Sequence, residues 1–211
     1  FRKALAAARD LDQVTAVATR LGDLGSPIDV AAHLGFVRDW HLVGPFDNAR
    51  DAGFATAFPP ETKCDLSAEL KGKGGAAVRW RAHHTTDPMA VVDLNEVIAK
   101  QDDVVAYALV VVESKTERAV ELRTSSNNTY KVFLNGRRVI AHDTAHHGMR
   151  ADQEAGKGTL KAGRNEILVK VCQDDGTQSK VRWWSFQLRV CDELGGAVPV
   201  RVVSPEPKGK P

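Results

Sequence analysis

The sequence predicts an all-β protein, an antiparallel β-sandwich of the jelly-roll kind with a short α-helical segment at its N-terminus. Two stretches carry this prediction. Tyr130–Val139, YKVFLNGRRV, places Asn-Gly between two alternating runs, and these two residues tolerate the positive φ of a type I′ hairpin. Leu160–Val171, LKAGRNEILVKV, repeats the pattern, because Ala-Gly turns the chain into a strand whose apolar residues share one face. Both stretches specify turns and strands of a sheet.

Residues 1–35 predict a helical lead-in. Lys3–Leu21 carries apolar residues at spacings of three and four, which is typical of one amphipathic helix, and Gly22 ends it. A second short helix is expected over Asp29–Leu34, ended by Gly35. A pair of helices cannot bury its apolar stripe alone. The lead-in is therefore expected either to end a preceding array of helical repeats or to pack on the sandwich.

Residues 36–197 predict the sandwich. Short apolar runs separated by turn residues, without alternating helices, favour a sandwich or jelly roll. Val104–Val112 is almost continuously apolar and predicts a central strand. The expected strands are Phe36–Val43, Ala77–Ala82, Val91–Leu94, Val104–Glu113, Arg118–Thr124, Tyr130–Leu134, Arg137–Ala141, Asn165–Cys172 and Arg182–Val190. Residues 198–211, which end in SPEPKGKP, predict a Pro/Lys-rich tail or linker.

Composition narrows the function classes. The chain has 211 residues, enough for one domain with an appendage, and a hydrophobic fraction of 43% that is ordinary for a globular protein. Its 29 basic and 27 acidic side chains give a net charge of +2, which argues against a nucleic-acid-binding surface. No apolar run approaches the roughly 18 residues of a membrane span. The chain begins at Phe1 without a Met, so we expect a piece of a longer protein.

Three cysteines, Cys64, Cys172 and Cys191, occur without a CxxC spacing, which disfavours zinc binding and dithiol redox chemistry. Buried free thiols are the favoured interpretation. A disulfide between Cys172 and Cys191 in an oxidising compartment stays open as the alternative.

The segment Gly44-Pro45-Phe46 is expected to end a strand sharply, because Pro cannot continue a ladder of hydrogen bonds. A structural turn is the favoured interpretation. The alternative is a loop that presents Phe46 and Asp47 to a ligand.

Two parts of the chain are similar to known modules. Asp39–Asn48, DWHLVGPFDN, followed by Pro59-Pro60-Glu61, resembles the opening of β-sandwich modules in large multidomain proteins of planctomycetes and related bacteria, often behind HEAT-like repeats. A second resemblance, to the galactose-binding-domain-like jelly roll of many carbohydrate-binding families, rests on Tyr130–Val139, Leu160–Val171 and the stretch WWSFQLRV. The resemblance covers about 36–192. Ser125–Asn128 stands where such modules carry DDG, so no ligand contact is carried over there.

This resemblance implies a setting for the chain. It implies a non-catalytic module of an exported bacterial protein, extracytoplasmic, whose partners are a polysaccharide or glycan and the neighbouring domains of the same chain. It also implies that a structural calcium ion could be bound. Asp174-Asp175-Gly176 offers hard carboxylate oxygens for calcium, although an ordinary β-turn explains the same residues better.

The candidate ligand-binding residues centre on Trp183-Trp184. Adjacent side chains on a strand point to opposite faces, so only one of the two indoles can enter the core. Packing on the N-terminal helix is the favoured interpretation of the outer indole. The alternative is an exposed indole that stacks on a sugar ring beside Arg182, and Trp184 is the candidate for this role. The amides of Asn127 and Asn128 and the imidazole of His142 are expected to hydrogen-bond sugar hydroxyls.

Metal binding and catalysis are the two other kinds of chemistry that the residues could support. His142-Asp143 with His146-His147 is the densest group of metal-ligand types, although its spacing fits no defined metal motif. The sequence has no G-x-S-x-G, P-loop, G-x-G-x-x-G after a strand or HExxH, so we expect no enzymatic activity. Carbohydrate recognition is the leading hypothesis. A structural or protein-interaction domain that caps a helical array, without a small ligand, is the alternative.

Overall fold

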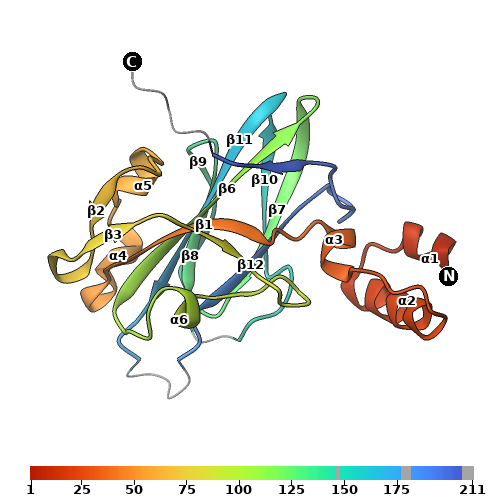
Figure 1. Ribbon diagram of the computed structural model, residues 1–211, viewed down its shortest axis with the longest axis horizontal. Helices are drawn as coiled ribbons and strands as arrows, with labels where there is room; N and C mark the ends of the chain where they lie inside the picture. Colours follow the sequence, from red (N-terminus) through yellow and green to blue (C-terminus); the bar gives the residue numbers. More distant parts are fainter. Residues whose placement is uncertain (146–147, 177–181, 206–211) are drawn as a thin grey trace.

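The computed structural model describes residues 1–145, 148–176 and 182–205. Two antiparallel sheets pack face to face (Figure 1). The N-terminal helices lie on one side of them, and residues 48–80 lie on the opposite side. The predicted antiparallel β-sandwich with an N-terminal helical segment is confirmed. Within the described part of the chain, no helix is long and apolar enough to cross a membrane.

The strands form two large sheets and a small one. The seven-stranded sheet has the order β4 (Arg81–His84), β1 (Asp39–Asp47), β6 (Val104–Ser114), β11 (Gly163–Gln173), β8 (Thr129–Leu134) and β9 (Arg137–His142), with β13 (Arg201–Val203) also on β6. The four-stranded sheet has the order β10 (Glu154–Leu160), β7 (Arg118–Ser126), β12 (Ser185–Cys191) and β5 (Val92–Asp93). The small sheet pairs β2 (Glu69–Lys71) with β3 (Ala77–Arg79).

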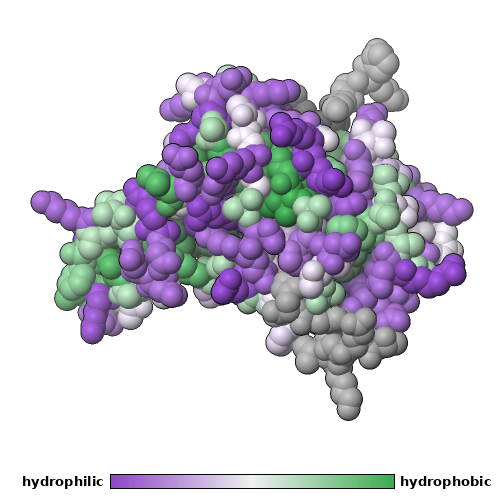
Figure 2. All heavy atoms as spheres, turned by 180° about the vertical axis from the view of Figure 1, so that it is seen from behind, coloured by the Kyte–Doolittle hydropathy of each residue, from purple (hydrophilic) through white to green (hydrophobic). Residues whose placement is uncertain are grey.

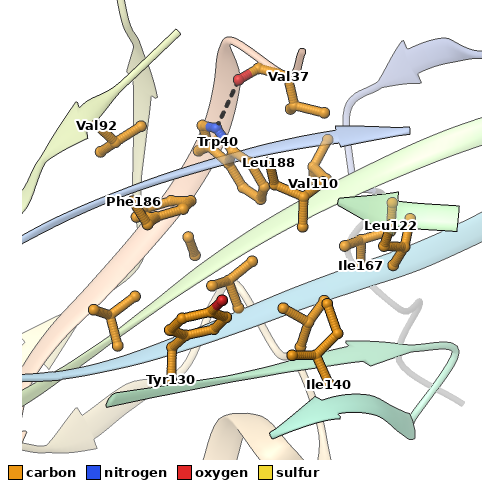
Figure 3. Packing of buried hydrophobic residues seen from close by; sticks show 14 of the residues in the cluster. Val37, Trp40, Val92, Val110, Leu122, Tyr130, Ile140, Ile167, Phe186 and Leu188 are labelled. Carbon is orange, nitrogen blue, oxygen red and sulfur yellow. Dashed lines mark hydrogen bonds between the residues drawn. The ribbon is translucent and has the colours of Figure 1, made fainter. Parts of the chain in front are cut away.

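The core lies between the inner faces of the two large sheets. As predicted, β6 is a central strand, buried along almost its whole length. Trp40 of β1 meets Phe186 of β12 edge to face at 5.1 Å, and the Trp40 Nε1 donates a hydrogen bond to the Val37 carbonyl at 3.1 Å (Figure 3). The indole thus satisfies its polar group while filling the interface of the sheets.

The two turns that predicted the fold have the expected backbone. Asn135 and Gly136 have φ of 52° and 80°, the left-handed pair that a type I′ hairpin needs, and they join β8 to β9. Gly163, with φ of 86°, opens β11.

Strand β10 was missed because its sequence, EAGKGTL, has little apolar alternation. Its glycines are required by close packing: a Cβ on Gly156 would lie 2.6 Å from the Ile140 Cγ1, and one on Gly158 would lie 2.6 Å from the Leu134 Cδ2. Both contacts are with side chains of the β8–β9 hairpin in the other sheet. The absence of side chains therefore lets the two sheets approach each other at this margin.

The prediction that Gly44-Pro45-Phe46 ends a strand is wrong. β1 runs through this segment and pairs with β6 on both sides of a register shift between Val43 and Phe46. A bulge accommodates the proline without ending the strand. Phe46 is fully buried and packs on Phe58 and Tyr107, at ring distances of 5.0 and 5.7 Å, so it is not presented to a ligand.

The helical lead-in consists of α1 (Arg2–Ala7), α2 (Leu11–Asp23) and α3 (Val30–Leu34). The single helix predicted over Lys3–Leu21 is therefore wrong. Asp10 interrupts it because its carboxylate caps α2, accepting hydrogen bonds from the amides of Asp12 and Gln13. Helix α3 begins after Asp29 and ends at Gly35, as predicted.

The lead-in packs on the sandwich. Its apolar residues share a cluster with Phe36 and Ala90, and the guanidinium of the buried Arg189 on β12 donates to the carbonyl of Leu34 at 3.2 Å. Seen from behind, hydrophobic residues lie on the left over the lead-in and in a patch at the upper centre, with hydrophilic residues around them (Figure 2). The structure thus shows one of the two expected arrangements, in which the lead-in packs on the sandwich.

Residues 48–80 cover the outer face of the seven-stranded sheet. This excursion contains the short helices η1 (Ala49–Asp51), α4 (Ala52–Ala55), α5 (Pro59–Thr62) and η2 (Lys73–Gly75), besides β2 and β3; α6 (Leu94–Val97) lies elsewhere, after β5. Glu61 of α5 accepts hydrogen bonds from the fully buried Lys170 Nζ at 2.8 Å and from the Tyr107 hydroxyl at 2.5 Å. A buried ion pair therefore holds the excursion on β11 and β6.

The three cysteines are free thiols, which confirms the favoured interpretation. Cys172 lies on β11 and Cys191 on β12, in different sheets, so the alternative disulfide is absent. Burial raises the pKa of the Cys172 thiol to about 12, which keeps it protonated and unreactive. Arg201–Val203, in the segment expected as a tail, form β13.

Candidate functional site

One end of the sandwich gathers most of the predicted site residues. Thr129 at the start of β8 pairs with Cys172 near the end of β11, and Tyr130 pairs with His142 at the end of β9. Asp103, just before β6, donates its amide to the Asp174 carbonyl at 2.9 Å. Loops that are far apart in the sequence therefore meet at the end of the sandwich near α6, at the bottom of Figure 1. We call this the loop end.

The tryptophan pair is oriented opposite to the prediction. Trp184 is fully buried, packs in the core and points its Nε1 to the Val171 carbonyl at 3.4 Å, so it cannot stack on a ligand. Trp183 is the outer residue, with 61% of its surface exposed. The cause is the alternation of β12, in which Phe186 and Leu188 face the core and impose the same side on Trp184.

Arg182, which precedes Trp183 in the sequence, lines a cleft of about 440 Å³. We name it the Arg182 cleft; its lining residues are Asp93, Asn95, Glu96, Lys100, Gln101, Asp102 and Arg182. Most of them come from α6 and the segment that leads into β6, so the cleft joins two parts of the chain almost ninety residues apart.

Arg182 is held in a defined position at the cleft. Its Nη1 lies 2.8 Å from the Asp102 carboxylate, and its carbonyl accepts a hydrogen bond from the Asn95 Nδ2 at 2.7 Å. Asp93 in turn caps α6 by accepting from the Asn95 amide at 2.9 Å. The backbone that carries Trp183 is thereby tied to α6.

Gly176 provides space for the guanidinium. A Cβ at this position would lie 1.2 Å from the Arg182 Nη1, and the φ of Gly176 is +64°, which disfavours residues with side chains. A side chain at position 176 would therefore have to displace the guanidinium from its present position, and it would also be strained by the positive φ.

Asn127 and Asn128 do not face a ligand. They join β7 in one sheet to β8 in the other and are 7% and 2% exposed. The Asn127 Oδ1 accepts from the Ser185 hydroxyl at 3.1 Å, and the Asn128 Nδ2 donates to Gln173. The prediction that their amides bind sugar hydroxyls is wrong, because both side chains are buried where the chain crosses between the sheets.

His142 is also engaged within the protein. Its Nδ1 lies 3.0 Å from the Glu154 carboxylate, its ring stacks on Tyr130 at 5.1 Å, and its side chain is 19% exposed. A direct contact of this imidazole with a ligand stays a prediction. The suggested metal group with His146 and His147 involves residues outside the described part of the chain.

The Asp174-Asp175 turn, suggested as a calcium site, forms a local hydrogen bond. The Asp174 Oδ1 accepts a hydrogen bond from the Gly176 amide at 2.8 Å, which is the local pattern of an ordinary turn. Among the described residues, no three His, Cys, Asp or Glu side chains are arranged to hold a metal. Calcium at this turn remains an unsupported prediction.

Carboxylates at the loop end lie close enough to influence one another. The pKa of Asp51 is raised, first by burial and then by the negative charges of Asp174, Asp175, Asp103 and Asp143. Five described carboxylates are therefore close to one another at this end of the molecule, although the whole chain has a net charge of +2.

Sequence reasoning missed Trp183, Asn95, Asp102 and Gly176. For Trp183 a signal existed: positions 184, 186, 188 and 190 are all apolar, so the register places residue 183 outside. For Asn95 and Asp102 there was none, because only the packing of α6 beside the start of β12 brings them to Arg182.

No protein-family model matches the chain, and no curated protein matches it significantly. Among solved structures, a β-glucosidase from Kluyveromyces marxianus is similar over 60% of this chain and 16% of that one, with 13% identity and a TM-score of 0.42. An anti-sigma factor domain-containing protein is similar over 80% and 46%, with 13% identity and a TM-score of 0.42. A family 35 carbohydrate-binding module from an environmental isolate is similar over 44% and 72%, with 15% identity and a TM-score of 0.28. The chain thus spans less than half of the first two proteins, and likenesses of this size do not assign it to a family.

Proposed function

We propose that this chain is a non-catalytic glycan-binding module whose site comprises Trp183 and the Arg182 cleft. The observation that carries the proposal is the exposure of Trp183, 61%, next to a residue that lines a polar cleft of about 440 Å³. An exposed flat ring and a cleft lined by hydrogen-bonding side chains together suit a sugar, whose rings have apolar faces and whose edges carry hydroxyls. The resemblance of 36–192 to galactose-binding-like modules of exported bacterial proteins agrees with this role.

Each polar residue of the site has a distinct task in the proposal. Asn95 and Gln101 offer amide donors and acceptors at the cleft, and Lys100 offers a donor. Arg182 uses its Asp102 ion pair to stay in place, so its remaining N–H groups are oriented towards a ligand. The indole of Trp183 supplies most of the contact area.

Affinity gel electrophoresis with a panel of plant, algal and microbial polysaccharides tests this function. We expect at least one polysaccharide to retard the protein and Trp183→Ala to remove at least about nine-tenths of the affinity, as loss of a stacking aromatic in a contact typically does. Phe1→Ala is the matched control, because Phe1 is an aromatic of similar exposure, 64%, on the helical lead-in. Retardation that is unchanged in Trp183→Ala, or absent for every polysaccharide, would overturn the proposal.

A structural role, in which the sandwich supports the helical lead-in and neighbouring domains, is the second candidate. The observation that favours it is the buried Arg189, whose guanidinium contacts Leu34 of the lead-in, Gly195 of the β12–β13 loop and Asp152. This role predicts that no glycan of the panel binds while the lead-in stays docked.

A further inference from the structure

The Arg182 cleft carries more carboxylates than cationic groups. Asp93, Glu96 and Asp102 line it together with Lys100 and Arg182, three acidic against two basic side chains. Arg182 and Asp102 neutralise each other at 2.8 Å. The remaining groups, Asp93, Glu96 and Lys100, are exposed to solvent, so a ligand in the cleft meets two carboxylates and one ammonium group.

The surroundings of the cleft strengthen its negative field. Asp103 directly follows Asp102 and is bonded through its amide to Asp174. Lys73, which donates to the carbonyls of Asp102 and Asp103 at 2.8 and 2.7 Å, adds one positive charge nearby. Among these described residues, the carboxylates of Asp93, Glu96, Asp102, Asp103 and Asp174 still outnumber the cationic groups of Lys73, Lys100 and Arg182.

A ligand with protonated amines suits this arrangement best. An ammonium group donates hydrogen bonds to carboxylates and to the amide oxygens of Asn95 and Gln101, and the face of an exposed indole attracts cations. A uronate or sulfate group would instead be repelled by the carboxylates of the loop end. We propose, on the basis of the glycan-binding function above, that the glycan recognised at this site carries amino sugars with free amino groups, as in polymers of glucosamine.

The test compares two ligands that differ at the amino group, which is free and charged in one and acetylated and neutral in the other. Calorimetric titration at low salt and about pH 6, where amino groups are protonated, uses glucosamine oligomers and their N-acetylated counterparts of equal length. We expect the free-amine oligomers to bind at least about fivefold more tightly, with the preference lost at about 0.5 M salt because charges at the surface are screened.

Two variants assign the preference to the cleft. Glu96→Gln and Asp93→Asn remove one charge each, and the Asn still caps α6. Each should reduce the preference for free amines about threefold without weakening the N-acetylated oligomer. Glu117→Gln is the control, because this exposed carboxylate lies in the turn between β6 and β7 at the other end of the sandwich.

The outcomes separate this inference from the proposed function. Equal binding of the two oligomers, a preference that Glu96→Gln and Asp93→Asn leave unchanged, or tighter binding of polygalacturonate would overturn the amino-sugar inference. If binding of any of these glycans is still lost in Trp183→Ala, the proposed function stands without it. Absence of binding to every glycan would overturn both.

Discussion

At the scale of single residues, Trp183 is the feature that needs a functional explanation. A tryptophan gains stability for the fold when it is buried, as Trp40 and Trp184 are, and contributes little when 61% of it faces solvent. The outward position of this side chain could be predicted from the alternating apolar residues of β12. Its neighbours in the cleft were not, because Asn95 and Asp102 reach Arg182 only through the packing of α6.

Gly176 makes a prediction at this scale. Gly176→Ala places a methyl group where the Arg182 guanidinium lies, so the ion pair with Asp102 must rearrange. We expect glycan affinity to fall about fivefold, whereas the free energy of unfolding falls by only about 1 kcal/mol, the usual cost of a side chain at positive φ.

Gly136→Ala is the matched control for Gly176→Ala. Gly136 also has positive φ, 80°, but no atom lies within 4 Å of an added Cβ. It should show a similar loss of stability and unchanged glycan affinity. Equal affinities for the two variants would contradict the role of Gly176 in positioning Arg182.

At the scale of elements, turn chemistry was predictable and long-range contacts were not. The Asn135-Gly136 hairpin follows from local backbone preferences alone. The continuation of β1 through Pro45 depends on pairing with β6, and the break between α1 and α2 depends on a cap that periodicity does not reveal. Strand β10 could not be predicted, because glycines that allow close contact with the other sheet stand where apolar side chains would indicate a strand.

The Glu61–Lys170 ion pair gives a prediction for one element, the excursion over the seven-stranded sheet. Glu61→Gln leaves the fully buried Lys170 ammonium without its counter-charge, and we expect a loss of about 3 kcal/mol in the free energy of unfolding, measured by urea titration. Glu69→Gln, which breaks the exposed pair with Arg79, serves as the control and should cost less than about 1 kcal/mol. Equal losses in the two variants would show that the buried pair does not stabilise the excursion.

At the scale of the whole molecule, Arg189 joins the sandwich, the lead-in and the segment before β10. Burial alone would raise the pKa of Asp152, but hydrogen bonds and charges from Arg189 and Arg123 outweigh it and hold that pKa below its ordinary value. A carboxylate with a depressed pKa stabilises the fold above its unfolded pKa, which is about 3.8. This contribution is lost as the pH falls below that value through the folded pKa.

The corresponding prediction concerns stability against pH. The urea midpoint of the protein should fall as the pH is lowered from about 5 to 3, and Asp152→Asn should remove part of this dependence while lowering stability at neutral pH. Glu117→Gln is the control, since this exposed carboxylate lies in the turn between β6 and β7, away from this junction. An unchanged pH profile in Asp152→Asn would contradict the role of this carboxylate.

The most direct test of the central claim, a glycan site at Trp183, is an NMR titration that observes the four tryptophan indole N–H signals. Trp183→Phe assigns the exposed signal by its disappearance. Addition of a glycan that retards the protein in gels should shift the Trp183 signal and leave those of the buried Trp40 and Trp184 nearly unchanged. A bound glycan that leaves the Trp183 signal in place would contradict the account.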